Sequence, residues 1–289
     1  MKPGMFIRVA VACGSFVLVG SGTSAAATLQ FASFTKASTN VADDAVALTK
    51  PFVREQLRYE RVREARSATE ERIVRMFEDR GIEFPAAELY LRVFKAERKL
   101  ELWVRAPDKD KFQLLKTYEI CALAGIVGPK SKQGDAQVPE GFYHIDLFNP
   151  TSSYHLSMRI DYPNKRDRLA NTRKYRLGGD IFIHGGCKSE GCLAMTDDGI
   201  NELYWIAVNA QANGQNRIPV HIFPARLHKD KDMKRIRNTF RPPPDILGFW
   251  DELKPGYEYF EKHRRVPTVF VDGQGHYQLA ESSNLRKAD

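Results

Sequence analysis

The stretch IFIHGGCKSEGCLAMTDDGI, residues 181–200, combines the residue types that most often carry covalent or metal chemistry. It places His184, Cys187 and Cys192 within nine positions, among four glycines. Imidazole and thiol groups at this spacing are compatible with a zinc site, with a disulfide loop, or with a cysteine nucleophile and its histidine base. Each alternative makes a different demand on the rest of the chain.

Zinc is the first alternative, because one histidine and two cysteines supply three good ligands. A structural zinc site needs a fourth ligand, and the sequence has no second C-x-x-C or H-x3-H pair. A catalytic zinc site needs an acidic general base, and only Asp180 and Glu190 are close in the sequence. We therefore expect neither a metal nor another cofactor.

Residues 1–27 have the pattern of a secretory signal peptide. Lys2 and Arg8 form a basic start, residues 9–20 are apolar, and small residues at 24–27 resemble a cleavage zone. We expect export to the periplasm, or a membrane tether if the leader stays uncleaved.

Disulfide formation is the second alternative, because exported proteins meet an oxidising environment. Removal of the leader leaves Cys121, Cys187 and Cys192, so at least one thiol is unpaired or bonded to another molecule. A Cys187–Cys192 bridge would leave His184 without a role. A Cys121–Cys187 bridge would instead leave Cys192 free, and the sequence leaves both pairings open.

The third alternative makes Cys192 a nucleophile and His184 its base, since an imidazole can accept the thiol proton. A strand ending at His184 and a helix starting just after Cys192 would place the sulfur at a helix N-terminus, which favours negative charge. Backbone N–H groups at that position could hold an oxyanion. Gly191 would allow close approach of the substrate backbone, and Ser189 could hydrogen-bond the loop.

The elements around this stretch predict a mainly β fold with added helices, in the α+β class. Patterns of apolar residues predict strands within 88–106 (with a turn at 96–98), 112–125, 142–148, 154–162, 180–185 and 218–225, the last of which closes the sheet. Helical patterns cover 51–80 and 197–209. We expect a signal peptide at 1–27, a mobile and helical segment at 28–86, a catalytic domain at 87–225 and an extension at 226–289.

The C-terminal extension contains an aromatic helix around ILGFWDELKPGYEYFEKHR. Trp250, Tyr257, Tyr259 and Phe260 could form a sugar-stacking surface, but such aromatics more often attach an extension to its domain, and we favour the second role. His221, on the last predicted strand, is expected to be a core histidine. Nothing in the sequence orients Tyr154 and His155.

The I-H-G of 183–185 followed by S-E-G-C at 189–192 resembles the active-site signature of the L,D-transpeptidase (YkuD-type) catalytic domain, a β-sandwich that acts on peptidoglycan through a cysteine. The segment GDAQVPEGFY, residues 134–143, is similar to a second block of that family. The resemblance spans roughly 88–225. It implies that Cys192 is the nucleophile and that His184 is the base, held by a backbone carbonyl near Gly185. It also implies that Tyr143 helps to shape the cleft.

Two features are similar to the YafK-type subgroup of this family. The gap between His184 and Cys192 is only seven residues, and Ala194 stands where common members carry arginine. This resemblance implies cleavage of the bond between diaminopimelate in peptidoglycan and the terminal lysine of the murein lipoprotein. Peptidoglycan stem peptides, and a peptidoglycan-linked lipoprotein, are the expected partners.

The sequence therefore predicts an exported cysteine enzyme that forms an acyl-enzyme at diaminopimelate and passes it to an amine or to water. The net charge of +8 is compatible with nucleic-acid binding, but no DNA- or RNA-binding signature accompanies it. Anionic envelope polymers are better partners for an exported basic protein. The alternative is a non-catalytic envelope-binding module whose cluster is a structural disulfide or zinc loop.

Overall fold

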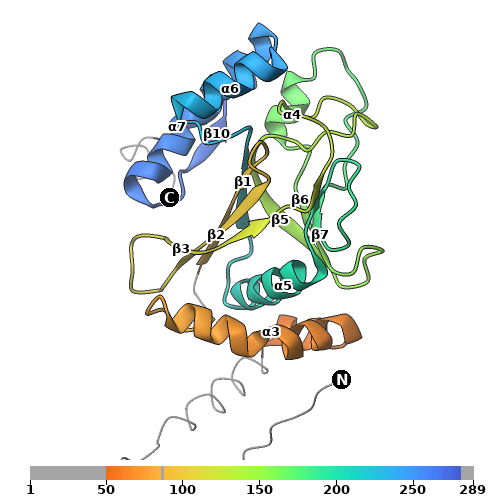
Figure 1. Cartoon of the computed structure of the whole chain (residues 1–289), viewed down its shortest axis with the longest axis vertical. Coiled ribbons are helices and arrows are strands. Elements are labelled where there is room, and N and C mark those ends of the chain that lie inside the picture. The colour runs from red at the N-terminus through yellow and green to blue at the C-terminus, as the bar shows by residue number, and fades with distance from the viewer. Residues whose placement is uncertain (1–49, 86–87, 281–289) are drawn as a thin grey trace, which may run out of the picture. The chain divides into compact units, whose positions relative to one another are not determined.

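A nine-stranded mixed β-sheet forms the centre of the fold in this computed structural model, which describes residues 50–85 and 88–280 (Figure 1). The strand order is β3-β2-β1-β9-β5-β6-β7-β8-β4. The bounds are β1 Glu88–Phe94, β2 Lys99–Arg105, β3 Gln113–Glu119, β4 Ala122–Leu123, β5 Gly141–Asn149, β6 Ser157–Ile160, β7 Phe182–His184, β8 Leu193–Ala194 and β9 Ile218–Phe223. The predicted α+β class is confirmed, with one curled sheet at its centre. The predicted signal peptide lies outside the described residues.

The first two strands form the hairpin that the sequence predicts. β1 and β2 pair antiparallel from Glu88 opposite Arg105 to Phe94 opposite Lys99. The turn between them is closed by the Arg98 amide, which donates to the Lys95 carbonyl oxygen at 3.1 Å. Almost every residue of both strands is buried, because both faces of this part of the sheet are covered.

Strand β9 lies in the middle of the sheet and does not close it, so that prediction is wrong. It pairs in parallel with β1 and antiparallel with β5. Ile218, Val220 and Ile222 belong to one hydrophobic core, whereas Phe223 belongs to a second core on the opposite face. A strand that is apolar on both faces is suited to the centre of a sheet, where both faces are covered. Its late position in the chain does not indicate which strands it pairs with.

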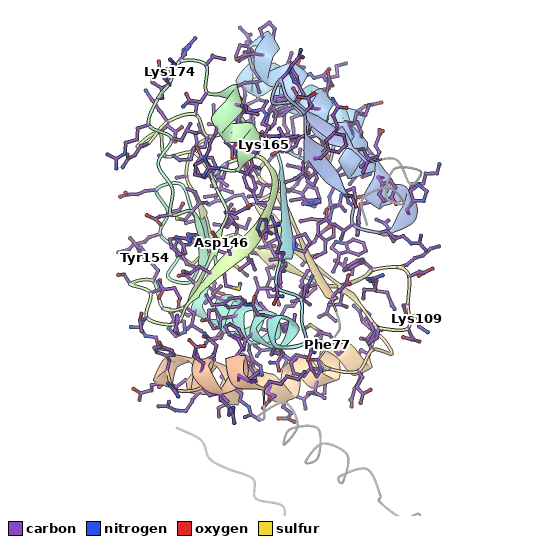
Figure 2. The ribbon with its side chains drawn as sticks, turned by 180° about the vertical axis from the view of Figure 1, so that it is seen from behind. Phe77, Lys109, Asp146, Tyr154, Lys165 and Lys174 are labelled. Carbon is purple, nitrogen blue, oxygen red and sulfur yellow. A yellow bond between two sulfur atoms is a disulfide. The ribbon has the colours of Figure 1, made fainter. Side chains whose placement is uncertain are left out.

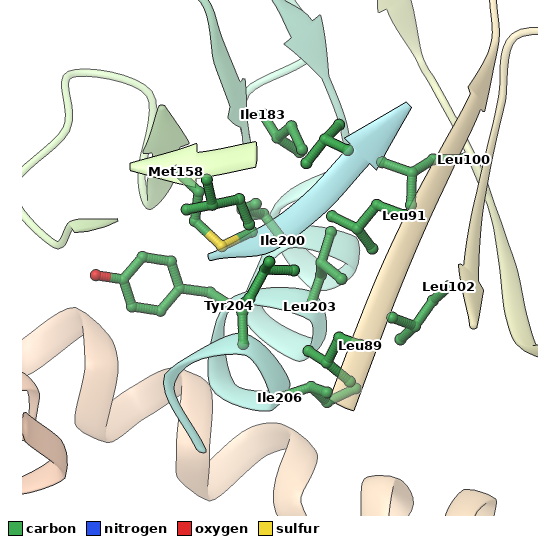
Figure 3. Close-up of a cluster of buried hydrophobic side chains, with 14 of the residues drawn as sticks. Leu89, Leu91, Leu100, Leu102, Met158, Ile183, Ile200, Leu203, Tyr204 and Ile206 are labelled. Carbon is green, nitrogen blue, oxygen red and sulfur yellow. The ribbon is translucent and has the colours of Figure 1, made fainter. Parts of the chain in front are cut away.

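Three helices cover one face of the sheet. α2 (Pro51–Gln56) and α3 (Glu60–Glu78) pack on α5 (Asp197–Ala212), which lies between α3 and the sheet (Figure 1). Figure 3 shows leucines of β1 and β2 pointing toward the α5 side chains Ile200, Leu203 and Ile206. Within residues 50–85 and 88–280, no helix is both long and apolar enough to cross a membrane.

The C-terminal segment covers the opposite side of the sheet. It consists of α6 (Asp230–Phe240), α7 (Pro244–His263) and a hairpin of β10 (Val269–Val271) and β11 (Tyr277–Leu279). Trp250, Tyr257 and Phe260 are fully or almost fully buried, as expected for aromatics that attach the extension to its domain. Tyr259 is half-buried against His263.

The sequence did not predict helices α4 (Lys165–Ala170) and α6. Both are rich in Lys, Arg and Asp and have few apolar residues at helical spacing. α4 is stabilised at its start by a capping box: Asn164 accepts from the Asp167 amide, and the Asp167 carboxyl accepts from the Asn164 amide. The polar connection expected between β6 and β7 therefore contains one short ordered helix.

Candidate active site

His184 and Cys192 are brought together by two adjacent parallel strands. β7 pairs with β8 so that Ile183 lies opposite Leu193 and His184 opposite Ala194. Cys192 directly precedes β8, and the Phe182 amide donates to its sulfur at 3.5 Å. Because side chains alternate along a strand, Phe182 and His184 lie on the same face of β7. The register places Cys192 level with Phe182, two positions before His184 on β7, and the sulfur contacts the Phe182 amide.

The His184 ring is oriented by the carbonyl of the next residue. Its Nδ1 lies 2.6 Å from the Gly185 oxygen, and the side chain is buried. A carbonyl oxygen can only accept, so Nδ1 is the donor and the neutral ring presents a free lone pair at Nε2. The Tyr154 ring lies 4.8 Å from the imidazole, centroid to centroid, and covers it from the solvent side. The imidazole is thus held in the tautomer of a general base.

The Cys192 thiol is half-buried and donates to the Asp180 carbonyl oxygen at 3.7 Å. Burial raises the pKa of this thiol above its ordinary value, and the carboxylates of Asp180 and Glu190 act in the same direction. The Phe182 amide and the Lys130 ammonium lower that pKa. The net direction is upward, so the resting group is a thiol.

Burial also lowers the pKa of His184, although the bond to the Gly185 carbonyl partly opposes this effect. A lowered histidine pKa and a raised cysteine pKa both favour uncharged groups at neutral pH. The pair is therefore a neutral thiol and a neutral imidazole at rest, which differs from the thiolate expected for a sulfur at a helix N-terminus.

Helix α5 does not begin beside the sulfur, and the expectation of a helix N-terminus at Cys192 is wrong. The helix begins at Asp197, with Thr196 as its N-cap. Leu193 and Ala194 intervene as strand β8, which pairs with β7 and β4. Leu193 and Ala194 thus form hydrogen-bonded pairs with β4 and β7 before the chain enters the helix.

The structure contains a disulfide between Cys121 and Cys187 and leaves Cys192 free. The Cys121 and Cys187 amides also donate to β8 and the residue after it, at the Ala194 and Met195 oxygens. The bridge therefore fixes the 185–191 loop to Cys121, which directly precedes β4. In the described part of the chain, no group of three His, Cys, Asp or Glu residues could hold a metal ion.

Ser189 and Gly191 shape the loop around the nucleophile. The Ser189 hydroxyl donates to the Cys192 carbonyl oxygen at 2.7 Å and accepts from the Gly191 amide at 3.2 Å. Gly191 has a φ of +130°, and a Cβ on it would lie 3.2 Å from the Gln137 carbonyl oxygen. Glycine is therefore required at this position because the 128–140 loop passes so close.

Gly185 is required for a similar reason. A Cβ on it would lie 2.5 Å from an Asp197 carboxylate oxygen, which accepts from the Gly186 amide at 2.8 Å. The carboxylate at the start of α5 thus fixes the residues that follow the histidine. The Gly185 carbonyl is in turn fixed toward His184.

Tyr143 is not placed to contact a substrate. Its side chain is 2% exposed, and its hydroxyl lies within hydrogen-bond distance of the Asp167 carboxyl, at 3.2 Å, and of the Glu140 carbonyl oxygen, at 3.1 Å. The expectation that it helps to shape the cleft is therefore wrong at the level of direct contact, since its ring belongs to the hydrophobic core. His221 is a core histidine, as expected: it is buried, lies 2.7 Å from the Tyr90 hydroxyl, and its pKa is lowered to about 3 by burial.

Sequence reasoning missed Lys130, which lowers the pKa of the Cys192 thiol electrostatically. Its ammonium is almost buried and binds the Asp135 carboxylate at 2.5 Å and the Lys132 carbonyl oxygen at 3.0 Å. Asp135 also accepts from three amides of its own loop. A lysine and an aspartate five residues apart in a glycine-rich loop are the signal that could have indicated a fixed charge here.

The chain matches known proteins across this region. Residues 89–222 match the model of the L,D-transpeptidase catalytic domain, YkuD. The chain is 40% identical over 185 residues to the protein named "Putative L,D-transpeptidase YafK" of Escherichia coli (strain K12), which covers 63% of this chain and 70% of that protein. The chain belongs to the L,D-transpeptidase family.

The L,D-transpeptidase match begins in β1 and ends in β9, so it includes both His184 and Cys192 and leaves α2, α3, α6 and α7 outside. The chain is also similar to the solved structure of the helical cell shape determining protein Pgp2 from Campylobacter jejuni, at 17% identity. That alignment covers 64% of this chain and 73% of the other, with a TM-score of 0.38.

Proposed function

We propose that this L,D-transpeptidase-family protein is an exported cysteine enzyme that forms an acyl-enzyme at diaminopimelate in peptidoglycan. The observation that carries the proposal is the hydrogen bond from His184 Nδ1 to the Gly185 carbonyl, which makes Nε2 the proton acceptor of the ring. Cys192, which directly precedes the strand paired with β7, is the one cysteine of the described chain outside the disulfide. Peptidoglycan as the substrate class follows from family membership.

The neutral state of the pair supports proton transfer in step with attack. As the Cys192 sulfur bonds to the carbonyl carbon on the L-centre, its proton passes to His184 Nε2, and the carbonyl oxygen becomes an oxyanion. When the tetrahedral intermediate collapses, the imidazolium returns that proton to the leaving amine and the thioester remains. An incoming amine or water then loses its proton to His184 as it attacks the thioester, and Cys192 leaves as the thiol.

Backbone N–H groups around Gly191 and Cys192 are the proposed oxyanion donors. The Gly191 amide is bound by the Ser189 hydroxyl at rest, so it would exchange this neutral acceptor for the oxyanion. A charged acceptor forms the stronger hydrogen bond, which favours the exchange only when charge develops.

The acceptor decides the reaction name, since one thioester serves both an amine and water. The likeness to YafK favours hydrolysis or transfer at the bond between diaminopimelate and a lipoprotein lysine. The protein would act in the periplasm on stem peptides and on a peptidoglycan-linked lipoprotein, and nucleic acid has no place in this reaction.

Mass spectrometry of products tests the proposal. Purified wild type and Cys192→Ala would each be incubated with lipoprotein-linked muropeptides. We expect cleavage or transfer by wild type, none by Cys192→Ala, and a thioester adduct on Cys192 in quenched samples. Intact substrate with wild type, or equal turnover by Cys192→Ala, would contradict the assignment and favour a non-catalytic binding module.

A further inference from the structure

A surface hollow of 410 Å³ begins at Asp180, the residue whose carbonyl oxygen accepts the hydrogen bond of the Cys192 thiol. Its wall continues through Gly179 and Gly178 into the basic connection between α4 and β7. A second hollow of 450 Å³ shares Asp180 and Gly179 with the first. Both hollows therefore share a residue that is hydrogen-bonded to Cys192, and both open to solvent.

The first hollow is held between two loops that both approach Cys192. Gln133, in the 128–140 loop, donates its amide to the Arg176 carbonyl oxygen at 2.7 Å, and its side chain packs on Gly178. Four residues later, the Gln137 carbonyl lies against Gly191. The wall of the hollow is thus tied to the loop that carries the nucleophile, so a ligand in the hollow would be positioned relative to the sulfur.

Two guanidinium groups line this space. Arg168 borders both hollows, and Arg176 borders the first. Both side chains are exposed, and within residues 50–85 and 88–280 neither makes an ion pair or a side-chain hydrogen bond. Planar guanidinium groups are the side chains best suited to bind a carboxylate through two parallel hydrogen bonds.

The carboxylates that border the two hollows already have partners. Asp146 and Asp180 both pair with Arg159, at 3.0 Å and 3.7 Å. Asp161 pairs with His144 at 2.9 Å and accepts from the His144 amide. Arg159 is therefore the counter-ion of Asp146 and Asp180, and Asp161 accepts from the His144 amide, which leaves the two arginines for an external anion.

We infer that Arg168 and Arg176 bind a free carboxylate of the peptide whose amide reaches Cys192. The inference rests on the proposed function and names the recognised group: the second carboxylate of diaminopimelate. Diaminopimelate carries two carboxyl groups, so when the L-centre carbonyl is attacked the carboxylate of the D-centre remains free on the same side chain. The hollow begins at Asp180, whose carbonyl oxygen accepts from the Cys192 thiol, and the two arginines on its wall lie where this group would extend.

Matched substrates test the inference. A stem peptide with a free D-centre carboxylate would be compared with the same peptide carrying a primary amide there, on wild type, Arg168→Gln, Arg176→Gln and Lys174→Gln. Lys174 is the control, because it lies on the same loop as Arg176, borders neither hollow and stands at the outer edge of the molecule in Figure 2. Binding to the same four proteins in a Cys192→Ala background would be measured by calorimetry.

For wild type, we expect the carboxylate peptide to have a kcat/KM about tenfold or more above that of the amide, the range of one or two charge-assisted hydrogen bonds. Arg168→Gln and Arg176→Gln should each reduce this preference, mainly by lowering kcat/KM for the carboxylate peptide. Lys174→Gln should keep the preference. An equal loss of carboxylate preference in all three variants would indicate that this basic region attracts any anion, and it would overturn the inference. The inference would also fail if wild type turned over the carboxylate and amide peptides with the same kcat/KM.

The two proposals fail in different ways. Turnover without carboxylate preference would retain the proposed function and reject the arginine subsite. Carboxylate preference in the binding measurement, with no turnover of either peptide by proteins that retain Cys192, would retain the subsite and reject the chemistry.

Discussion

Trp250 of α7 donates its indole N–H to the Glu140 carboxylate at 2.7 Å, and this contact joins the C-terminal extension to the loop beside the nucleophile. The other Glu140 oxygen accepts from the Gly128 amide at 2.6 Å and pairs with Lys95 at 3.1 Å. Lys95 also donates to the Gly128 and Val138 carbonyls. One buried carboxylate thus fixes both ends of the 128–140 loop, which carries Lys130 and contacts Gly191.

We therefore predict that Trp250→Phe lowers activity as well as stability. Phenylalanine keeps an aromatic ring in the core but leaves a Glu140 oxygen without its donor, at a cost of about 1–3 kcal/mol in the free energy of unfolding. Because Glu140 holds the loop, kcat on the muropeptide substrate should fall in protein that is still fully folded. Denaturant titration and steady-state kinetics measure the two effects.

Trp205→Phe is the matched control for this experiment. The Trp205 indole donates to Glu70 at 3.2 Å, in the contact between α5 and α3 and away from the loop. It should lose stability without a loss of kcat. If both variants lose kcat in proportion to stability, Trp250 has no positioning role.

Lys130→Met should slow alkylation of Cys192 at neutral pH. The ammonium lowers the pKa of the Cys192 thiol, which burial has already raised, so its removal raises that pKa further and reduces the thiolate fraction. The labelling rate at neutral pH should fall about 3–10-fold, as expected if the pKa of the thiol rises by roughly half a unit to one unit. Iodoacetamide labelling rates from pH 7 to 10 give the measurement.

Lys132→Met serves as the comparison for Lys130→Met. Lys132 is an exposed lysine in the same loop, and only its backbone bonds to Asp135. Its alkylation profile should overlay that of wild type. A profile that shifts equally in both variants would show that loop charge in general, and not Lys130, acts on the sulfur.

Much of the fold could be predicted from local patterns, because the hairpin of β1 and β2, the helix α5 and the aromatic anchors Trp250 and Tyr257 each bury a contiguous or periodic set of apolar residues. The order of strands in the sheet could not be predicted. The position of β9 depends on which edges meet in space, and its apolar residues are equally compatible with the centre and with the end of the sheet.

The candidate site divides in the same way. His184 and Cys192 are identifiable because imidazole and thiol at short spacing among glycines have few structural uses. The role of Asp180 is that of a backbone carbonyl, which leaves no trace in residue type, and Tyr154 approaches the imidazole from a loop 30 residues earlier in the chain. Tyr143 is predicted to lie at the cleft because it belongs to a recognisable motif, but its side chain is buried in the hydrophobic core.

Stability should decrease as pH rises through the range in which Asp167 loses its proton. Burial raises the pKa of this carboxyl to about 7, from an ordinary value of 3.8. The folded state therefore binds the proton more tightly than the unfolded state, so its stabilising effect is complete below about pH 4 and is lost as pH rises to about 7. The loss should be on the order of a few kcal/mol at most.

Asp167→Asn should remove this dependence. An asparagine carbonyl can still accept from the Asn164 amide and the Tyr143 hydroxyl, so the cap of α4 is retained without a buried charge. Urea titrations at pH 4, 5.5, 7 and 8 should show a smaller decline in the variant and a higher stability than wild type at pH 8. Parallel curves for the two proteins would contradict the raised pKa.

Removal of the Cys121–Cys187 bridge should destabilise the fold but spare the nucleophile. The bridge joins residues 66 positions apart, and the chain-entropy model assigns about 4 kcal/mol to a loop of that length. The double variant Cys121→Ser, Cys187→Ser should unfold at lower denaturant concentration. It should also bind substrate less well, because the 185–191 loop loses its attachment to β4, the short strand beside Cys121.

The identity of the reactive thiol distinguishes this arrangement from its competitor, because either bridge leaves one cysteine free: Cys192 here, and Cys121 if Cys187 were bonded to Cys192. Protein produced without residues 1–27 should have one thiol that reacts with Ellman's reagent, and peptide mapping should place it at Cys192 in the wild type as well as in the double variant. A Cys187–Cys192 bridge predicts instead that Cys192 is unreactive in wild type and reactive only after Cys187→Ser. That result would remove the free sulfur on which the acyl-enzyme depends, so mapping of the reactive cysteine tests the disulfide assignment and the proposed nucleophile together.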